Sequence, residues 1–138
     1  MPLFKISFTL MLFANLQGFA RPHQQQKNNN INYQPIENTI ARAAIKALQE
    51  SDVSKWKSLF IVGAKLYDDD GSPRDFQDFS TKAIGHEYFL SLDKIENQGT
   101  TVYGHFHTEK YGDFRARFNF HINTAGKISR LDISQVKY

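Results

Sequence analysis

Apolar and polar residues alternate most regularly between residues 113 and 123. Successive side chains of a β-strand point to opposite faces of a sheet, so this pattern predicts a strand with one buried and one polar face. Three further segments, at 86–97, 101–109 and 127–137, have similar character and are separated by turn residues, which predicts a four-stranded meander. The expected buried face carries Phe114, Ala116, Phe118, Phe120 and Ile122, and the polar face carries Arg115, Arg117, Asn119 and His121.

The loop between the second and third of these strands predicts how they pair. Residues 110–112 fit a three-residue hairpin loop in which Gly112 is left-handed. With this loop, the apolar positions of both strands share one face, which supports the predicted register. The predicted cross-strand pairs are Glu109–Asp113, His107–Arg115 and His105–Arg117.

Helical spacing dominates before residue 84. Apolar residues recur on one stripe between Pro35 and Glu50, with Gln49 expected away from that stripe, so we predict a helix there. Asp52 is expected to cap a second helix that carries Trp56 and extends toward Gly63. A short strand at 64–67, an acidic turn at 68–73 and a third helix at 74–83 follow.

The first twenty residues have the three parts of a secretory signal peptide. A single positive charge, Lys5, precedes an apolar run from Ile6 to Leu16, and the segment ends in Gly18-Phe19-Ala20. The run is too short and too polar for a membrane-spanning helix. We therefore predict cleavage after Ala20, a secreted or periplasmic protein, and no stable membrane anchor after cleavage.

Composition limits what the rest of the chain can be. Residues 21–35 are rich in Gln and Asn and are expected to form a flexible polar leader before a single domain at 36–138. The chain has no cysteine, which excludes thiol catalysis and thiolate metal sites. Loss of Lys5 lowers the net charge from +3 to +2, so we expect no nucleic-acid partner.

Two stretches resemble a known family. Residues 56–60 (Trp-Lys-Ser-Leu-Phe) followed by 64–69, and the ending 126–131, are similar to passages of SnoaL-like domains of the nuclear-transport-factor-2-like superfamily. The resemblance implies an α+β, cystatin-like cone: N-terminal helices packed on a curved antiparallel sheet, with a pocket open at one end. It also implies a homodimer through the outer sheet face, which here carries Tyr103, His105, His107, Arg115, Arg117, Asn119 and His121.

Aromatic residues are the expected lining of that pocket. A pocket lined by rings with few polar groups suits a flat, mostly apolar small molecule. The leading hypothesis is therefore an exported small-molecule-binding domain with no defined reaction and no cofactor, in which binding is favoured over catalysis. The expected ligand-binding residues are Trp56, Phe60, Tyr67, Phe79, Tyr88, Phe106, Phe118 and Phe120.

Two alternatives remain open at this stage. A cofactor-independent isomerase or cyclase would need a pocket Asp and Tyr, for which Asp68, Asp70 and Tyr67 are the candidates. The acidic run 68–70 also fits a plain solvated turn. The other alternative is a dimeric interaction module that uses the polar sheet face.

The pair His105-x-His107 has the spacing of two metal ligands on one strand. In the predicted register, however, both histidines face arginines, whose positive charge repels a metal ion. We therefore predict no metal site.

Overall fold

The computed structural model describes residues 31–69 and 71–138. The predicted signal peptide, the first ten residues of the predicted leader and the candidate Asp70 lie outside these ranges. None of the described helices is long and apolar enough to cross a membrane. At the start of the described chain, the Ile36 N–H donates to the Tyr33 carbonyl at 3.0 Å, and the Tyr33 ring packs against the core.

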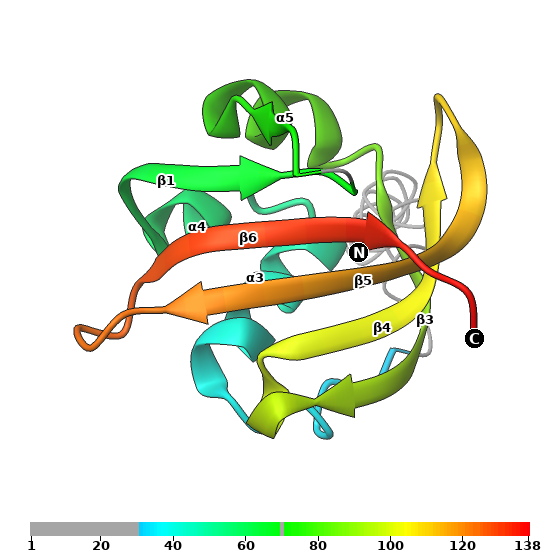
Figure 1. The fold of residues 1–138 in the computed structure, drawn as a ribbon, viewed down its shortest axis with the longest axis horizontal. Helices are drawn as coiled ribbons and strands as arrows, with labels where there is room; N and C mark the ends of the chain where they lie inside the picture. The colour runs from blue at the N-terminus through cyan, green and yellow to red at the C-terminus, as the bar shows by residue number, and fades with distance from the viewer. Residues whose placement is uncertain (1–30, 70) are drawn as a thin grey trace, which may run out of the picture.

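Helices cover one face of a curved six-stranded sheet (Figure 1). The helices are α3 (Thr39–Gln49), α4 (Val53–Ser58) and α5 (Phe76–Ala83), with a short 3₁₀ turn at Asn97–Gly99. The strands are β1 (Phe60–Tyr67), β2 (Pro73–Arg74), β3 (Tyr88–Glu96), β4 (Thr101–Thr108), β5 (Gly112–Ile122) and β6 (Ile128–Gln135). Their order in the sheet is β2-β1-β6-β5-β4-β3.

The predicted α+β class and its curved sheet are confirmed, with one correction to the strand directions. The meander β3–β6 is antiparallel, but β1 pairs in parallel with β6. These two strands are far apart in the sequence, and the connection between them returns the chain so that both run the same way. The sheet is therefore mixed.

Three helix boundaries were predicted wrongly, including the start of the third helix, which begins at Phe76 after the Asp75 cap rather than at residue 74. The first helix begins at Thr39 because the Asn38 side chain accepts hydrogen bonds from the Ile40 and Ala41 N–H groups, and Pro35 lies in the preceding turn. The second helix ends at Ser58, and Phe60 already belongs to β1. Strand pairing with β6 buries Phe60 and Leu66, so tertiary packing overrides the helical spacing that runs on toward Gly63.

The β4–β5 register differs from the prediction by two residues. The observed pairs are Thr108↔Gly112, His107↔Asp113, His105↔Arg115 and Tyr103↔Arg117. The buried Thr108 side chain holds the loop at 109–111, because its hydroxyl donates to the Gly112 carbonyl and accepts from the Tyr111 N–H, both at 2.9 Å. A shift of two residues leaves every side chain on its predicted face.

The core lies between the helices and the concave side of the sheet. The rings of Phe89, Phe106 and Phe118 contact one another with centroids 5.0–5.2 Å apart. The buried Trp56 indole N–H donates to the Ser80 hydroxyl at 3.0 Å, which satisfies its polar atom. Gln49, expected to point away from the helix stripe, is fully buried in this core.

Candidate functional site

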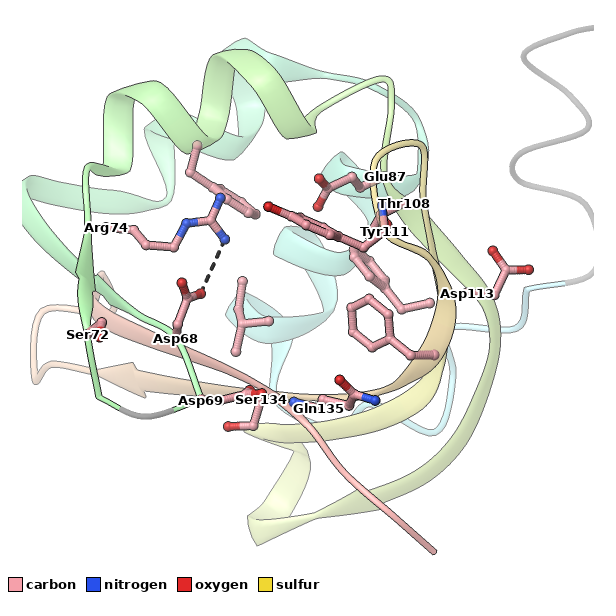
Figure 2. Close-up of a pocket in the computed structure, with 14 residues that line it drawn as sticks. Asp68, Asp69, Ser72, Arg74, Glu87, Thr108, Tyr111, Asp113, Ser134 and Gln135 are labelled. Carbon is pink, nitrogen blue, oxygen red and sulfur yellow. Dashed lines mark hydrogen bonds and ion pairs between the residues drawn. The ribbon is translucent and has the colours of Figure 1, made fainter.

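A cavity of about 700 Å³ opens at one end of the sheet (Figure 2). It lies between the turn after β1, helix α5, the β4–β5 loop and the end of β6. Its apolar wall is formed by Phe79, Phe106, Phe114 and Ile133. Its polar lining includes Asp68, Asp69, Arg74, Glu87, Tyr111 and Asp113.

Internal bonds hold the acidic turn on one side of the mouth. The Arg74 guanidinium forms an ion pair with Asp68 at 3.3 Å and lies 4.9 Å from the centroid of the Phe79 ring. The Asp69 carboxylate accepts a hydrogen bond of 2.6 Å from the Gln135 N–H, which ties the turn to the end of β6. The carboxylates of Asp68 and Asp69 are therefore already engaged by the protein itself.

Tyr111 lies on the opposite side of the mouth. The Thr108 hydroxyl fixes its backbone, while its side chain is 72% exposed. Figure 2 shows its ring directed across the mouth toward the Arg74 guanidinium. A fixed backbone with an exposed ring suits a side chain that covers a bound molecule.

Glu87 lies at the mouth, just after α5. Burial raises the pKa of its carboxyl above the ordinary value, the positive charges of Arg74 and His86 partly offset this, and the negative charges of Glu109 and Asp68 add to it. Among the described residues, no side chain or backbone group forms a hydrogen bond or ion pair with this carboxylate. Among the described carboxylates that line the cavity, the half-buried Glu87 carboxylate is thus the one whose charge no hydrogen bond or ion pair offsets.

The structure divides the sequence-predicted site residues into three groups. Phe79, Phe106 and Asp68 line the cavity. Four other aromatic residues are buried in the core and do not line the cavity: Trp56, Phe60, Phe118 and Phe120.

The two predicted tyrosines belong to the third group, on the outer side of the sheet. The Arg130 guanidinium lies 4.3 Å from the Tyr67 ring centroid, and the Tyr88 ring contacts the His107 ring at 5.0 Å between centroids. Neither tyrosine lines the cavity.

Sequence reasoning missed Arg74, Glu87, Tyr111 and Ile133 as lining residues. Arg74 and Glu87 lie just outside the ends of α5 and β3, where the predicted helix and strand extended too far, and Tyr111 lies in a loop, so the pattern gave none of them a place at the cavity. Ile133 is part of the apolar alternation of β6, which predicts a buried position without separating core from cavity. Asp68 is the charged lining residue that the sequence did mark, as part of the acidic run 68–70.

The outer sheet face carries histidine–carboxylate pairs. His105 pairs with Asp93 at 2.9 Å, His107 with Asp113 at 2.6 Å, and His121 with Asp132 at 2.8 Å. The corrected register gives His107 an acid as its cross-strand partner, so the predicted arginine neighbour was wrong. Within residues 31–69 and 71–138, no three acidic or histidine side chains are grouped to hold a metal ion.

No family model matches the chain, and no curated protein matches it. Solved structures do resemble it. An NTF2-like protein of unknown function from Cytophaga hutchinsonii has a TM-score of 0.58 at 13% identity, over 78% of this chain and 93% of that chain. A candidate polyketide cyclase from Xanthomonas campestris has a TM-score of 0.53 at 14% identity, over 76% of this chain and 93% of that chain.

A third similar structure is the orange carotenoid protein of Anabaena (Nostoc) sp., solved with canthaxanthin. Its TM-score is 0.58 at 19% identity, and the match covers 73% of this chain but 36% of that chain. At these identities the likeness establishes the fold alone. The predicted nuclear-transport-factor-2-like, cystatin-like fold is thereby confirmed.

Proposed function

We propose that this protein binds a small, largely apolar molecule in the cavity at the open end of its sheet, without catalysing a reaction on it. The observation that carries the proposal is the cavity itself. Its volume of about 700 Å³ lies within the ordinary range for small-molecule sites, roughly 300–1,000 Å³. Its lining combines an apolar wall, against which the apolar part of a ligand can pack, with polar and charged groups that can fix the ligand's orientation.

The similar structures support this proposal by analogy of fold. One of them is named for a carotenoid and was solved with canthaxanthin, an extended apolar molecule. Another is named as a candidate polyketide cyclase. The same curved sheet thus occurs in a protein that holds an apolar ligand.

Binding of the neutral fluorophore Nile red tests the proposal. We expect saturable binding to the purified protein, because the rings of Phe106 and Phe114 offer apolar surface inside an accessible cavity. Ile133→Trp adds an indole to the wall and is expected to weaken binding at least tenfold by filling the volume. Fluorescence titration measures both affinities, and native mass spectrometry of the unheated protein looks for a copurified ligand.

Val62→Trp is the matched control, since Val62 is fully exposed on β1 and away from the cavity. It adds the same indole and should leave Nile red affinity unchanged. Thermal unfolding of both variants checks that each is folded. Equal binding by Ile133→Trp and the unchanged protein would show that the dye binds elsewhere and would count against the cavity.

The catalytic alternative has weaker support from the geometry. Asp68 is held in an ion pair with Arg74, and Tyr67 lies on the outer face, so the predicted Asp–Tyr pair does not meet in the cavity. Glu87 is the acid in the lining with a raised pKa, and it would be the base of any proton transfer there. Dimerisation through the outer face stays a prediction.

We also propose that the protein is exported, on the basis of residues 1–20. Cleavage after Ala20 should give a mature chain that begins at Arg21. N-terminal sequencing of the full-length chain expressed in a secreting host measures this. A product that keeps Met1 and stays with the producing cells would contradict the proposal.

A further inference from the structure

Carboxylates outnumber positive groups in the described cavity lining, and one of these carboxylates lacks a partner. Four carboxylates and one guanidinium line it. Asp68 pairs with Arg74, Asp113 pairs with His107, and Asp69 accepts from the Gln135 N–H. Glu87 is left, among the described lining residues, as the carboxylate without a hydrogen-bonding partner.

The backbone around Glu87 is firmly held. Its N–H donates to the Ala83 carbonyl at 2.8 Å, at the end of α5. Two residues later, both backbone polar groups of Phe89 are bonded to the buried Gln49 side chain. Figure 2 shows the carboxylate at the mouth beside the Tyr111 ring. A half-buried carboxylate on a firmly held backbone is therefore presented where a ligand would enter.

Aromatic rings line the same cavity as this carboxylate. Phe79, Phe106 and Phe114 line the wall, and Tyr111 lies across the mouth. The faces of such rings attract cations. Two rings already do so within the protein: the Arg74 guanidinium lies 4.9 Å from the Phe79 centroid, and the Lys110 ammonium lies 5.3 Å from the Tyr111 centroid.

We infer that the cavity selects apolar molecules that carry one protonated amine, with the ammonium group at Glu87 and the apolar part against Phe106, Phe114 and Ile133. This inference rests on the proposed binding function and adds the chemical class of the ligand. An ammonium group supplies the donors that the Glu87 carboxylate lacks, and its charge offsets the cost of half-burying that carboxylate. An anionic ligand would instead meet an excess of carboxylates.

Three probes with one skeleton test the inference: 2-naphthylmethylamine, 2-naphthylmethanol and 2-naphthoate, each displacing Nile red at pH 7. The amine should bind about tenfold more tightly than the alcohol, a difference of about 1.4 kcal/mol, because both can donate a hydrogen bond to the Glu87 carboxylate but only the ammonium group brings an opposite charge to it. The naphthoate should bind most weakly. In Glu87→Gln the preference for the amine over the alcohol should fall below about twofold, while alcohol binding is kept.

Glu109→Gln is the matched control. Glu109 is an exposed acid near Glu87, it pairs with His86 at 3.1 Å, and it does not line the cavity. Its removal should leave the preference for the amine intact. A loss of preference in Glu109→Gln equal to that in Glu87→Gln would overturn the assignment to Glu87.

The pH dependence gives a second readout that needs no variant. The charged groups that act on Glu87 are Arg74, His86, Glu109 and Asp68, and its pKa lies above the ordinary 4.5. Amine affinity should therefore fall as the pH falls through this raised pKa, because the carboxyl becomes neutral, while alcohol affinity stays flat. This readout and the probe series on the unchanged protein decide the question even if Glu87→Gln does not fold.

The outcomes separate the two proposals. Equal binding of amine and alcohol, or tightest binding of the naphthoate, overturns the inference and leaves the binding function in place. Failure of Nile red and all three probes to bind overturns the binding function and the inference with it.

Discussion

Replacing Gly104 by alanine is expected to destabilise the protein by about 3 kcal/mol or more, through a backbone clash that neither strand can relieve. A Cβ at Gly104 would lie 2.0 Å from the Ser91 carbonyl oxygen and 2.8 Å from Cδ1 of Phe89. Both atoms belong to β3, which pairs with β4 through an irregular register on either side of this point. Urea unfolding, followed by the fluorescence of the single tryptophan, Trp56, measures the loss.

Gly126→Ala is the control for the general effect of adding a methyl group to a glycine. Gly126 has a φ of +80°, and nothing lies within 4 Å of its missing Cβ, so backbone strain alone should cost about 1 kcal/mol. If Gly104→Ala cost no more than Gly126→Ala, the close approach of β3 and β4 at Ser91 would be contradicted.

Most of the fold could be predicted from the sequence because hydrophobic periodicity is a local signal. The alternation of β5 places Ala116 and Phe118 inside and Arg115 outside, as predicted. The β4–β5 register was predicted two residues away because it depends on a side chain, Thr108, that bonds across the loop. Burial patterns specify faces, and they do not distinguish between registers that differ by two.

The candidate site was harder to predict because it depends on where elements end. Phe118 and Phe106 look alike in the sequence, yet Phe118 lies in the core and Phe106 lines the cavity. Phe106 lies near the end of β4, close to the β4–β5 loop that forms part of the mouth, whereas Phe118 lies farther from that loop along β5. Glu87 and Tyr111 lie in connecting segments, and their convergence depends on long-range contacts that a single sequence does not reveal.

Replacing Gln49 by leucine is expected to cost about 3 kcal/mol, because two buried backbone groups lose their partners. The Gln49 amide donates to the Phe89 carbonyl at 3.0 Å and accepts from the Phe89 N–H at 2.6 Å. β3 is an edge strand, so its outward backbone groups have no neighbouring strand there. Leucine has a similar volume, which separates the loss of these hydrogen bonds from the opening of a cavity.

Gln77→Leu on the exposed side of α5 is the matched control and should change the free energy of unfolding by less than about 0.5 kcal/mol. Urea unfolding with Trp56 fluorescence measures both variants. A cost for Gln49→Leu as small as that of the control would show that the two hydrogen bonds from Gln49 to the Phe89 backbone do not stabilise β3.

Gln49→Glu tests the same two hydrogen bonds through the pH dependence of stability. Ordinary acid unfolding lowers stability as the pH falls, whereas this variant is expected to lose stability as the pH rises. The ionised carboxylate can accept from the Phe89 N–H but cannot donate to the Phe89 carbonyl, and its burial raises the pKa of the new carboxyl above its unfolded value. Stability relative to the unchanged protein should be greatest below the unfolded pKa of about 4.3 and be lost as the pH rises through the folded pKa. Because Phe89 is two residues from Glu87, the same variant should also weaken amine binding at pH 7. A loss of stability that does not change with pH would contradict the two hydrogen bonds to Phe89. An unchanged amine affinity would show that these bonds do not position the mouth of the cavity.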